Sequence, residues 1–218
     1  MIDLHVHTYF SDGKNSPAVA MRYAKAAGYR AIAFTDHVDA SNMRHVLENL
    51  LPMVRAYGPY AGIDLFAGVE LTHVPAALVP DAIREARAMG AHIVSVHGQT
   101  LADIVEEGTN LAAIEGGADI LCHPGLITEQ EAVLAAERGV LLEITTRPGH
   151  ALANGHVAVT ARRCGTKLVI NNDAHHSSDF VSRDKRKAIA LGAGMTPDEI
   201  RQAEENSRAL VVRLLRNV

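Results

Sequence analysis

The sequence contains no tryptophan, four phenylalanines and two cysteines among its 218 residues. The two cysteines, Cys122 and Cys164, are too few for a disulfide framework and agree with a reducing compartment, so we predict a cytoplasmic protein. A formal net charge of -4 offers no basic surface to a nucleic-acid backbone and leaves a small anionic molecule open as a partner. No apolar run is long enough to span a bilayer, and neither export nor membrane insertion is expected.

Histidine is the residue present in unusual number. The chain has twelve histidines, three times as many as phenylalanines. Histidine is the commonest metal ligand in proteins and a frequent acid or base. The positions of these histidines therefore decide how the sequence is interpreted.

Short apolar runs alternate with longer stretches rich in Ala, Glu, Lys and Arg, a pattern typical of repeated βα units and a parallel sheet. The predicted strands are residues 2–6, 31–35, 64–69, 92–96, 119–122, 140–145 and 167–170, and the predicted helices between them include 17–27, 41–57, 80–89, 129–138 and 156–164. The chain after the seventh strand is predicted to be helical, with Thr196 as the cap of the last helix. No linker interrupts the pattern, so we predict one α/β domain over residues 1–218, built as a closed or nearly closed barrel of seven βα units. The alternative is an open doubly wound sheet.

Potential metal ligands recur where the predicted strands end. His5 and His7 share one face of the first strand because side chains alternate along a strand. Asp36 and His37 follow the second strand, and the ends of later strands carry Glu70, His97, His123, Asp173 and His175. The carboxyl ends of parallel barrel strands meet at one rim, so these side chains are expected to converge there.

Imidazole and carboxylate ligands without cysteine suit a catalytic site for zinc, manganese or iron. Two ions that share Glu70 as a bridging carboxylate would activate a bridging water as hydroxide. Burying so many ionisable groups without metal would be costly, which favours the metal site over a packing role. Asp12 alone would be interpreted as a turn residue, but its place just after the His5–His7 pair makes it a predicted ligand, whereas Asp36 is predicted to orient its neighbours.

Three further residues are predicted to bind substrate at the same rim. Arg147 and His150 lie in the loop after the sixth strand, and His73 follows the third. A guanidinium at Arg147 would grip two phosphate oxygens in a planar fork, although a plain surface arginine is the alternative. Cys122 is expected to point away from His123 and to serve packing.

These motifs occur in a recognisable order: His5-Val6-His7-Thr8 with Ser11-Asp12-Gly13, Thr35-Asp36-His37, Gly68-Val69-Glu70, Val96-His97-Gly98, Cys122-His123-Pro124-Gly125 and Asn172-Asp173-Ala174-His175. The series resembles the polymerase and histidinol phosphatase (PHP) superfamily. The resemblance implies a distorted (β/α)7 barrel with a trinuclear metal site. It also implies the ligand sets: His5, His7, Glu70 and Asp173 for the first metal, Glu70, His97 and His123 for the second, and Asp12, His37 and His175 for the third.

The expected function is metal-dependent hydrolysis of a phosphomonoester, with histidinol phosphate as one candidate by family resemblance. Glu70, Asp173 and His175 are the expected catalytic residues, two or three divalent ions (Zn, Mn or Fe) the expected cofactors, and a small phosphorylated metabolite the expected partner. The alternatives are a phosphodiesterase or exonuclease acting on nucleotides or nucleic-acid ends, and a non-catalytic metal-bearing interaction module.

Overall fold

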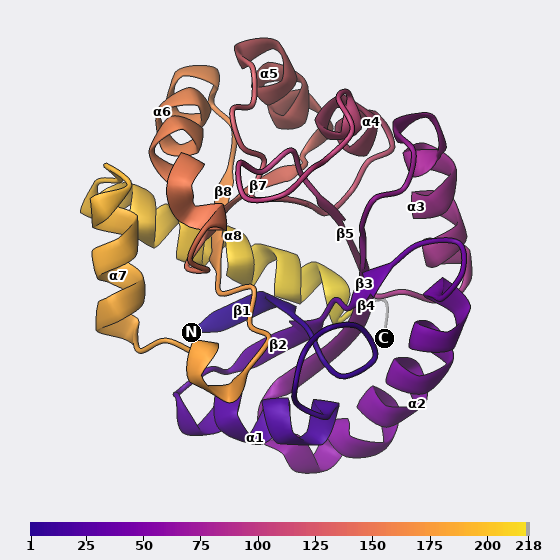
Figure 1. Ribbon diagram of the computed structural model, residues 1–218. Coiled ribbons are helices and arrows are strands. Elements are labelled where there is room, and N and C mark those ends of the chain that lie inside the picture. The colour runs from indigo at the N-terminus through magenta and orange to yellow at the C-terminus, as the bar shows by residue number, and fades with distance from the viewer. Residues whose placement is uncertain (217–218) are drawn as a thin grey trace.

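Seven parallel strands form a nearly closed barrel in the computed structural model, which describes residues 1–216 (Figure 1). The prediction of one domain over residues 1–218 thus includes two residues, 217 and 218, that lie outside the described part of the chain. The barrel strands are β1 (Ile2–Val6), β2 (Ala31–Phe34), β4 (Asp64–Leu71), β5 (Ile93–His97), β6 (Ile120–Cys122), β7 (Leu141–Thr145) and β8 (Leu168–Asn171), and a short β3 (His37–Val38) pairs with β4. The predicted barrel is confirmed, and the open-sheet alternative is wrong.

The barrel closes between β1 and β8 through side chains as much as through backbone. One isolated bridge joins Val6 to Ala174. Earlier in β1, Leu4 N donates to Asn171 Oδ1 over 3.0 Å, and Asp3 Oδ1 accepts a hydrogen bond from Asn172 N over 3.0 Å. Side chains from both strands thus take the place of a regular ladder at this seam.

Helices cover the outside of the barrel, as the alternating pattern predicts (Figure 1). They are α1 (Pro17–Ala26), α2 (Met43–Ala61), α3 (Val79–Ala88), α4 (Thr109–Glu115), α5 (Glu129–Arg138), α6 (Asn154–Cys164), α7 (Arg183–Gly192) and α8 (Pro197–Leu214), with short 3-10 turns η1 (Ala76–Leu78), η2 (His150–Ala153) and η3 (Ser177–Asp179). Thr196 caps α8 as expected, in a capping box with Glu199. The helix α2 runs past the predicted end at residue 57.

The barrel interior is packed, and its amino-terminal end is covered by α8. Figure 1 shows this helix crossing behind the barrel. Its residues Leu210, Val211 and Leu214 pack against inward-facing side chains such as Leu4 and Phe66. A second apolar cluster fills the layer between strands and outer helices. Open space for a ligand is therefore left at the opposite, carboxyl-terminal rim. No helix among residues 1–216 is long and apolar enough to cross a membrane.

Candidate metal centre

The nine predicted metal-site residues come together at the carboxyl-terminal rim. They are His5 in β1, His7 just after it, Asp12 in the following loop, His37 in β3, Glu70 in β4, His97 at the end of β5, His123 after β6, and Asp173 and His175 after β8. Glu70 lies within its strand rather than at the end, because β4 continues to Leu71 and pairs there with β3. All are buried except Asp12 and His37, whose side chains are 58% and 25% exposed.

Sharp backbone turns aim some of these side chains at the barrel axis. His123 and Asp173 have positive φ angles of 28° and 55°. Such angles cost about 1–3 kcal/mol each in residues other than glycine and cluster at functional sites. Within β6 the side chains alternate, with Ile120 and Cys122 in the barrel interior and Leu121 in the outer layer. The turn at His123 ends this alternation, so His123 also points inward, toward Glu70.

The carboxylate of Glu70 lies at the centre of the cluster and is fully buried. Each of its oxygens faces imidazole nitrogens from different parts of the chain. Oε2 lies 3.2 Å from His5 Nε2, 3.5 Å from His7 Nε2 and 2.9 Å from His37 Nδ1, whereas Oε1 lies 3.4 Å from His97 Nδ1 and 3.5 Å from His123 Nε2. One carboxylate thus connects five histidines, as expected of a residue that bridges more than one cation.

Asp173 forms a second acidic centre. Its Oδ1 is 3.2 Å from His7 Nε2 and 3.6 Å from His5 Nε2, and its Oδ2 is 3.8 Å from His123 Nε2. Glu70 in β4 and Asp173 in the loop after β8 therefore face the same three histidines.

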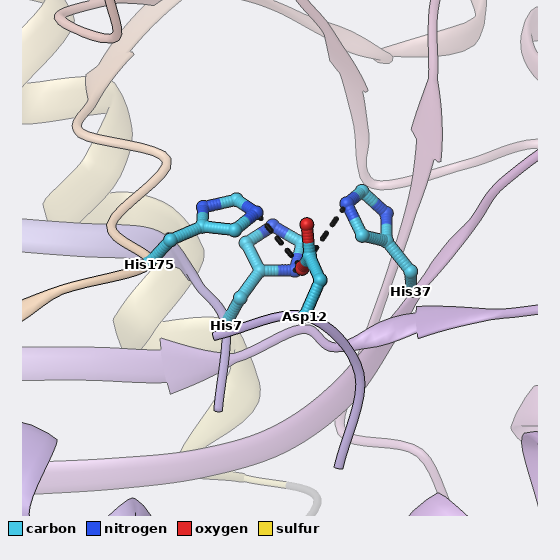
Figure 2. Close-up of side chains that lie close together, drawn as sticks. All are labelled: His7, Asp12, His37 and His175. Carbon is cyan, nitrogen blue, oxygen red and sulfur yellow. Dashed lines mark ion pairs between the residues drawn. The ribbon is translucent and has the colours of Figure 1, made fainter. Parts of the chain in front are cut away.

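The outermost ligand group surrounds Asp12. Figure 2 shows the rings of His7, His37 and His175 gathered about its carboxylate. Oδ1 of Asp12 is 3.0 Å from His175 Nε2, 3.7 Å from His37 Nε2 and 4.0 Å from His7 Nδ1. His7 has one ring nitrogen toward this group and the other toward Glu70, so it lies between two of the ligand sets that the sequence resemblance implies.

Asp36 holds the loop that carries Asp12. Its Oδ1 accepts hydrogen bonds from Thr8 N and Ser11 Oγ, each over 2.7 Å, and its Oδ2 accepts one from Thr8 Oγ1 over 2.8 Å. Both carboxylate oxygens are thus engaged away from the histidine cluster. This agrees with the expectation that Asp36 orients its neighbours.

Glu143 supports the cluster from inside the barrel. Its Oε1 lies 2.9 Å from His5 Nδ1 and accepts a hydrogen bond from Asn171 Nδ2, and its Oε2 accepts one from His123 N. A carboxylate on the far nitrogen of an imidazole sets the tautomer and leaves the other nitrogen free for a cation. Glu143 therefore points His5 Nε2 at Glu70.

Most buried polar atoms without a hydrogen-bond partner belong to this cluster. Among residues 1–216, the buried polar atoms without a partner, apart from Arg186 Nε, number ten. They are His5 Nε2, Asp173 Oδ1, the two carboxylate oxygens of Glu70, and the two ring nitrogens of each of His7, His97 and His123. An unsatisfied buried polar group costs about 1–3 kcal/mol, so ten together are a large penalty for packing alone. Divalent cations would satisfy them, and this donor set fits such cations.

The pKa values of His7, His123 and Glu70 also suit cation binding. Burial lowers the pKa of His7 and of His123 well below the usual value, and neighbouring histidines lower both further. Burial acts in the opposite direction on Glu70, but His5 and His37 bring the pKa of this carboxyl well below its usual range. Neutral imidazoles beside an ionised carboxylate are the forms that bind metal.

A cavity of about 480 Å³ opens above the cluster. The three predicted substrate-binding residues, Arg147, His73 and His150, all line it. His150 stacks on His123 with ring centroids 4.2 Å apart, and burial together with His97 lowers its pKa to about 4. His156, also in the sequence after β7, instead bonds to Ile127 O and does not line the cavity.

Sequence reasoning missed one residue near the site and misjudged another. Asp103 lines the cavity and lies 3.4 Å from His73 Nε2 and 3.6 Å from His97 Nε2. It stands in an irregular loop, where no strand pattern indicates direction. Cys122 groups with His5 and Glu70 under the site, and burial raises the pKa of its thiol well above the usual value. Cys122 packs in the inner core as expected, but the expectation that it points away from His123 is wrong, because it relied on strand alternation continuing through His123.

Comparison of sequences relates the chain to known proteins. A family model described as the PHP domain matches residues 3–122. The chain is 42% identical over 200 residues to an uncharacterised protein of Methanocaldococcus jannaschii, covering 91% of this chain and 92% of that protein. It is 26% identical over 217 residues to ribonuclease P protein component 3 of Methanosarcina barkeri, covering 92% of this chain and 84% of that protein.

Comparison of structures finds the same barrel elsewhere. A chain of archaeal ribonuclease P, solved with mature tRNA, has a TM-score of 0.73 at 18% identity and covers 98% of this chain and 91% of that one. Histidinol phosphate phosphatase from Lactococcus lactis, solved with zinc, L-histidinol and phosphate, has a TM-score of 0.61 at 17% identity, with 89% and 94% covered. At these identities the likeness shows a shared fold.

Proposed function

This chain belongs to the PHP domain family, and from that membership and the geometry of its rim we propose that it is a metal-dependent phosphatase acting on a small phosphomonoester. The observation that carries the proposal is the set of ten buried, unpartnered ligand atoms that meet around Glu70 and Asp173. A barrel that needed only stability would fill this space with apolar side chains. The cytoplasmic location predicted from the two cysteines is part of the same proposal.

The proposed cofactors are two or three ions of zinc, manganese or iron, which suit imidazole and carboxylate donors. We assign His5, His7, Glu70 and Asp173 to the first, Glu70, His97 and His123 to the second, and Asp12, His37 and His175 to the third. When bound, such ions supply neutralisation of phosphoryl oxygens and a water that is acidic enough to attack near neutral pH.

The protein's own groups supply binding and orientation. Asp173 and His175 line the cavity, so they are the proposed catalytic residues with direct access to an ester, while Glu70 lies fully buried below and acts through the ions it holds. Arg147 Nη1 donates to Asp173 O over 3.2 Å, and its Nε is 3.6 Å from Asp173 Oδ2. The remaining N–H groups of this guanidinium are proposed to grip phosphoryl oxygens at the cavity wall.

Phosphate release by protein loaded with manganese or zinc tests the proposal, against a panel of monoesters that includes histidinol phosphate and nucleotides. His123→Ala is expected to abolish turnover and reduce bound metal, while His45→Ala, at an exposed histidine on α2, keeps both. Circular dichroism would show that each variant remains folded. Full activity of His123→Ala would contradict the assignment.

A second candidate function comes from the relative that is a ribonuclease P protein component. In this alternative the chain binds RNA, either as a phosphodiesterase that cleaves RNA ends or as a metal-bearing module without activity. It predicts tRNA binding that weakens steeply with salt, because phosphate contacts release counterions. Cleavage of a diester with no activity on monoesters would favour the diesterase, and stoichiometric metal without hydrolysis of any ester would favour the module.

A further inference from the structure

A second cavity of about 520 Å³ adjoins the proposed reaction site on the side of β8 and α7. It shares Arg147 and Asp173 with the first cavity, so the two meet where these side chains touch. Its wall is partly apolar, formed by Pro148, Val181 and Ile189, and it also contains Lys185. A molecule held at Arg147 thus has room to extend away from the histidine cluster.

The acidic groups of this second cavity already have partners. Asp173 contacts Arg147, and Asp179 Oδ2 accepts hydrogen bonds from the backbone N–H groups of His175 over 3.0 Å and His176 over 2.9 Å. Lys185 differs, because no ion pair involves its side chain among residues 1–216. It is the unpaired cation of this wall.

The place of Lys185 on its helix has a local disadvantage. Ser182 caps α7, and its Oγ accepts a hydrogen bond from Lys185 N over 3.3 Å, so the lysine lies in the first helical turn. A cation at this end opposes the helix dipole, and an acidic residue is preferred there. Helix stability therefore does not account for a lysine at this position.

We propose that the second cavity is the leaving-group subsite and that Lys185 selects phosphomonoesters whose alcohol carries a second anionic group, a carboxylate or another phosphate. This inference rests on the proposed phosphatase function. Arg147 holds the phosphoryl group where the two cavities meet, the apolar wall contacts the carbon skeleton, and Lys185 binds the distal anion. An ester whose alcohol carries an amine instead, such as histidinol phosphate, is disfavoured because its cation faces Lys185.

The test compares 3-phosphoglycerate with glycerol 3-phosphate, which share a three-carbon skeleton and differ in the carboxylate. Wild-type protein is expected to have the higher kcat/KM for 3-phosphoglycerate. Lys185→Ala should reduce that value by about tenfold or more, the effect of losing one hydrogen bond between charged groups, and should leave glycerol 3-phosphate nearly unchanged. Lys187→Ala, at an exposed lysine on the same helix that does not line the cavity, should change neither.

A charge reversal provides the second variant. Lys185→Glu should fold, because a glutamate three residues after Ser182 completes a capping box. This variant is expected to prefer glycerol 3-phosphate. Added salt should weaken the preference of the wild type for 3-phosphoglycerate, because it screens the charge of Lys185.

The outcomes separate this inference from the function on which it rests. Equal kcat/KM of the wild type for both esters would overturn the subsite but not the phosphatase function. A ratio of the two kcat/KM values that Lys185→Ala leaves unchanged would have the same consequence. Hydrolysis of histidinol phosphate but of neither glycerol derivative would do the same. No phosphate release from any monoester would overturn the proposed function and the subsite together.

Discussion

Replacing Glu143 by glutamine tests whether a buried carboxylate orients the metal-binding histidines. The side chain is fully buried, and its two oxygens receive three contacts: His5 Nδ1 at 2.9 Å, Asn171 Nδ2 at 2.9 Å and His123 N at 3.1 Å. All three partners act as donors when His5 carries its proton on Nδ1. A carboxylate accepts from all of them, whereas an amide has one oxygen and one NH₂ group.

The smallest loss can be worked out from these contacts. If the amide oxygen of Glu143→Gln stays with His5 and Asn171, its NH₂ group faces the backbone N–H of His123, and that buried donor is left without a partner. If the amide is flipped, its NH₂ group faces His5 and Asn171, and two hydrogen bonds are lost instead of one. One unsatisfied buried donor costs about 1–3 kcal/mol of folding free energy. Weaker orientation of His5 should also reduce metal affinity by about 10–100-fold.

Two assays measure the effects separately. Urea denaturation of metal-free protein gives the change in stability, and competition with a chromophoric chelator gives the affinity for zinc. Glu137→Gln, at an exposed glutamate on α5, is the matched control and should behave as wild type in both. A Glu143→Gln protein with unchanged zinc affinity and an unchanged denaturation midpoint would refute the orienting role.

Two further predictions concern stability away from Glu143. Arg162 donates to both carboxylate oxygens of Glu199 and lowers its pKa to about 2. Because this pKa lies below that of an unfolded glutamate, the pair stabilises the fold above about pH 4.3, and the benefit disappears as pH falls toward 2. The difference in free energy of unfolding between wild type and Glu199→Gln, measured in urea, should therefore shrink on acidification. A difference that stays constant with pH would contradict this. The contribution of the pair to stability is small because the pair is exposed. Gly98→Ala is expected to lose about 1–3 kcal/mol and some metal affinity, because a Cβ there would overlap the Cys122 carbonyl oxygen and lie 2.8 Å from Pro124 Cα. Gly155→Ala is the control, because its Cβ would lie 3.8 Å from Ala193 O, an ordinary van der Waals contact. Equal stability of the two alanine variants would count against the close approach at Gly98.

The location of the candidate site could be predicted from local sequence patterns. Strand alternation places His5 and His7 on one face, and the βα rhythm places the ends of all parallel strands at one rim. Both rules depend only on neighbouring residues along the chain. All nine predicted ligands accordingly lie in one cluster.

Local rules failed where the backbone leaves regular structure. The alternation of β6 stops at His123, whose φ angle is positive, so His123 and Cys122 both face inward and the expectation that they point apart was wrong. Asp103 belongs to an irregular loop and meets His73 and His97 only because that loop folds over the rim. No periodicity in the sequence predicts such an approach.

The sequence by itself determined the seven βα units, the capped last helix and the identity of the residues that end the strands, because these depend on propensity, periodicity and capping over a few residues. Only the tertiary structure decided which groups act on one another. Glu143 meets His5 across 138 residues of chain, and Lys185 lines a cavity together with Arg147. Such pairs are set by closure of the barrel and by the packing of α7 beside it. Their distances follow from the whole fold and from no segment of the chain alone.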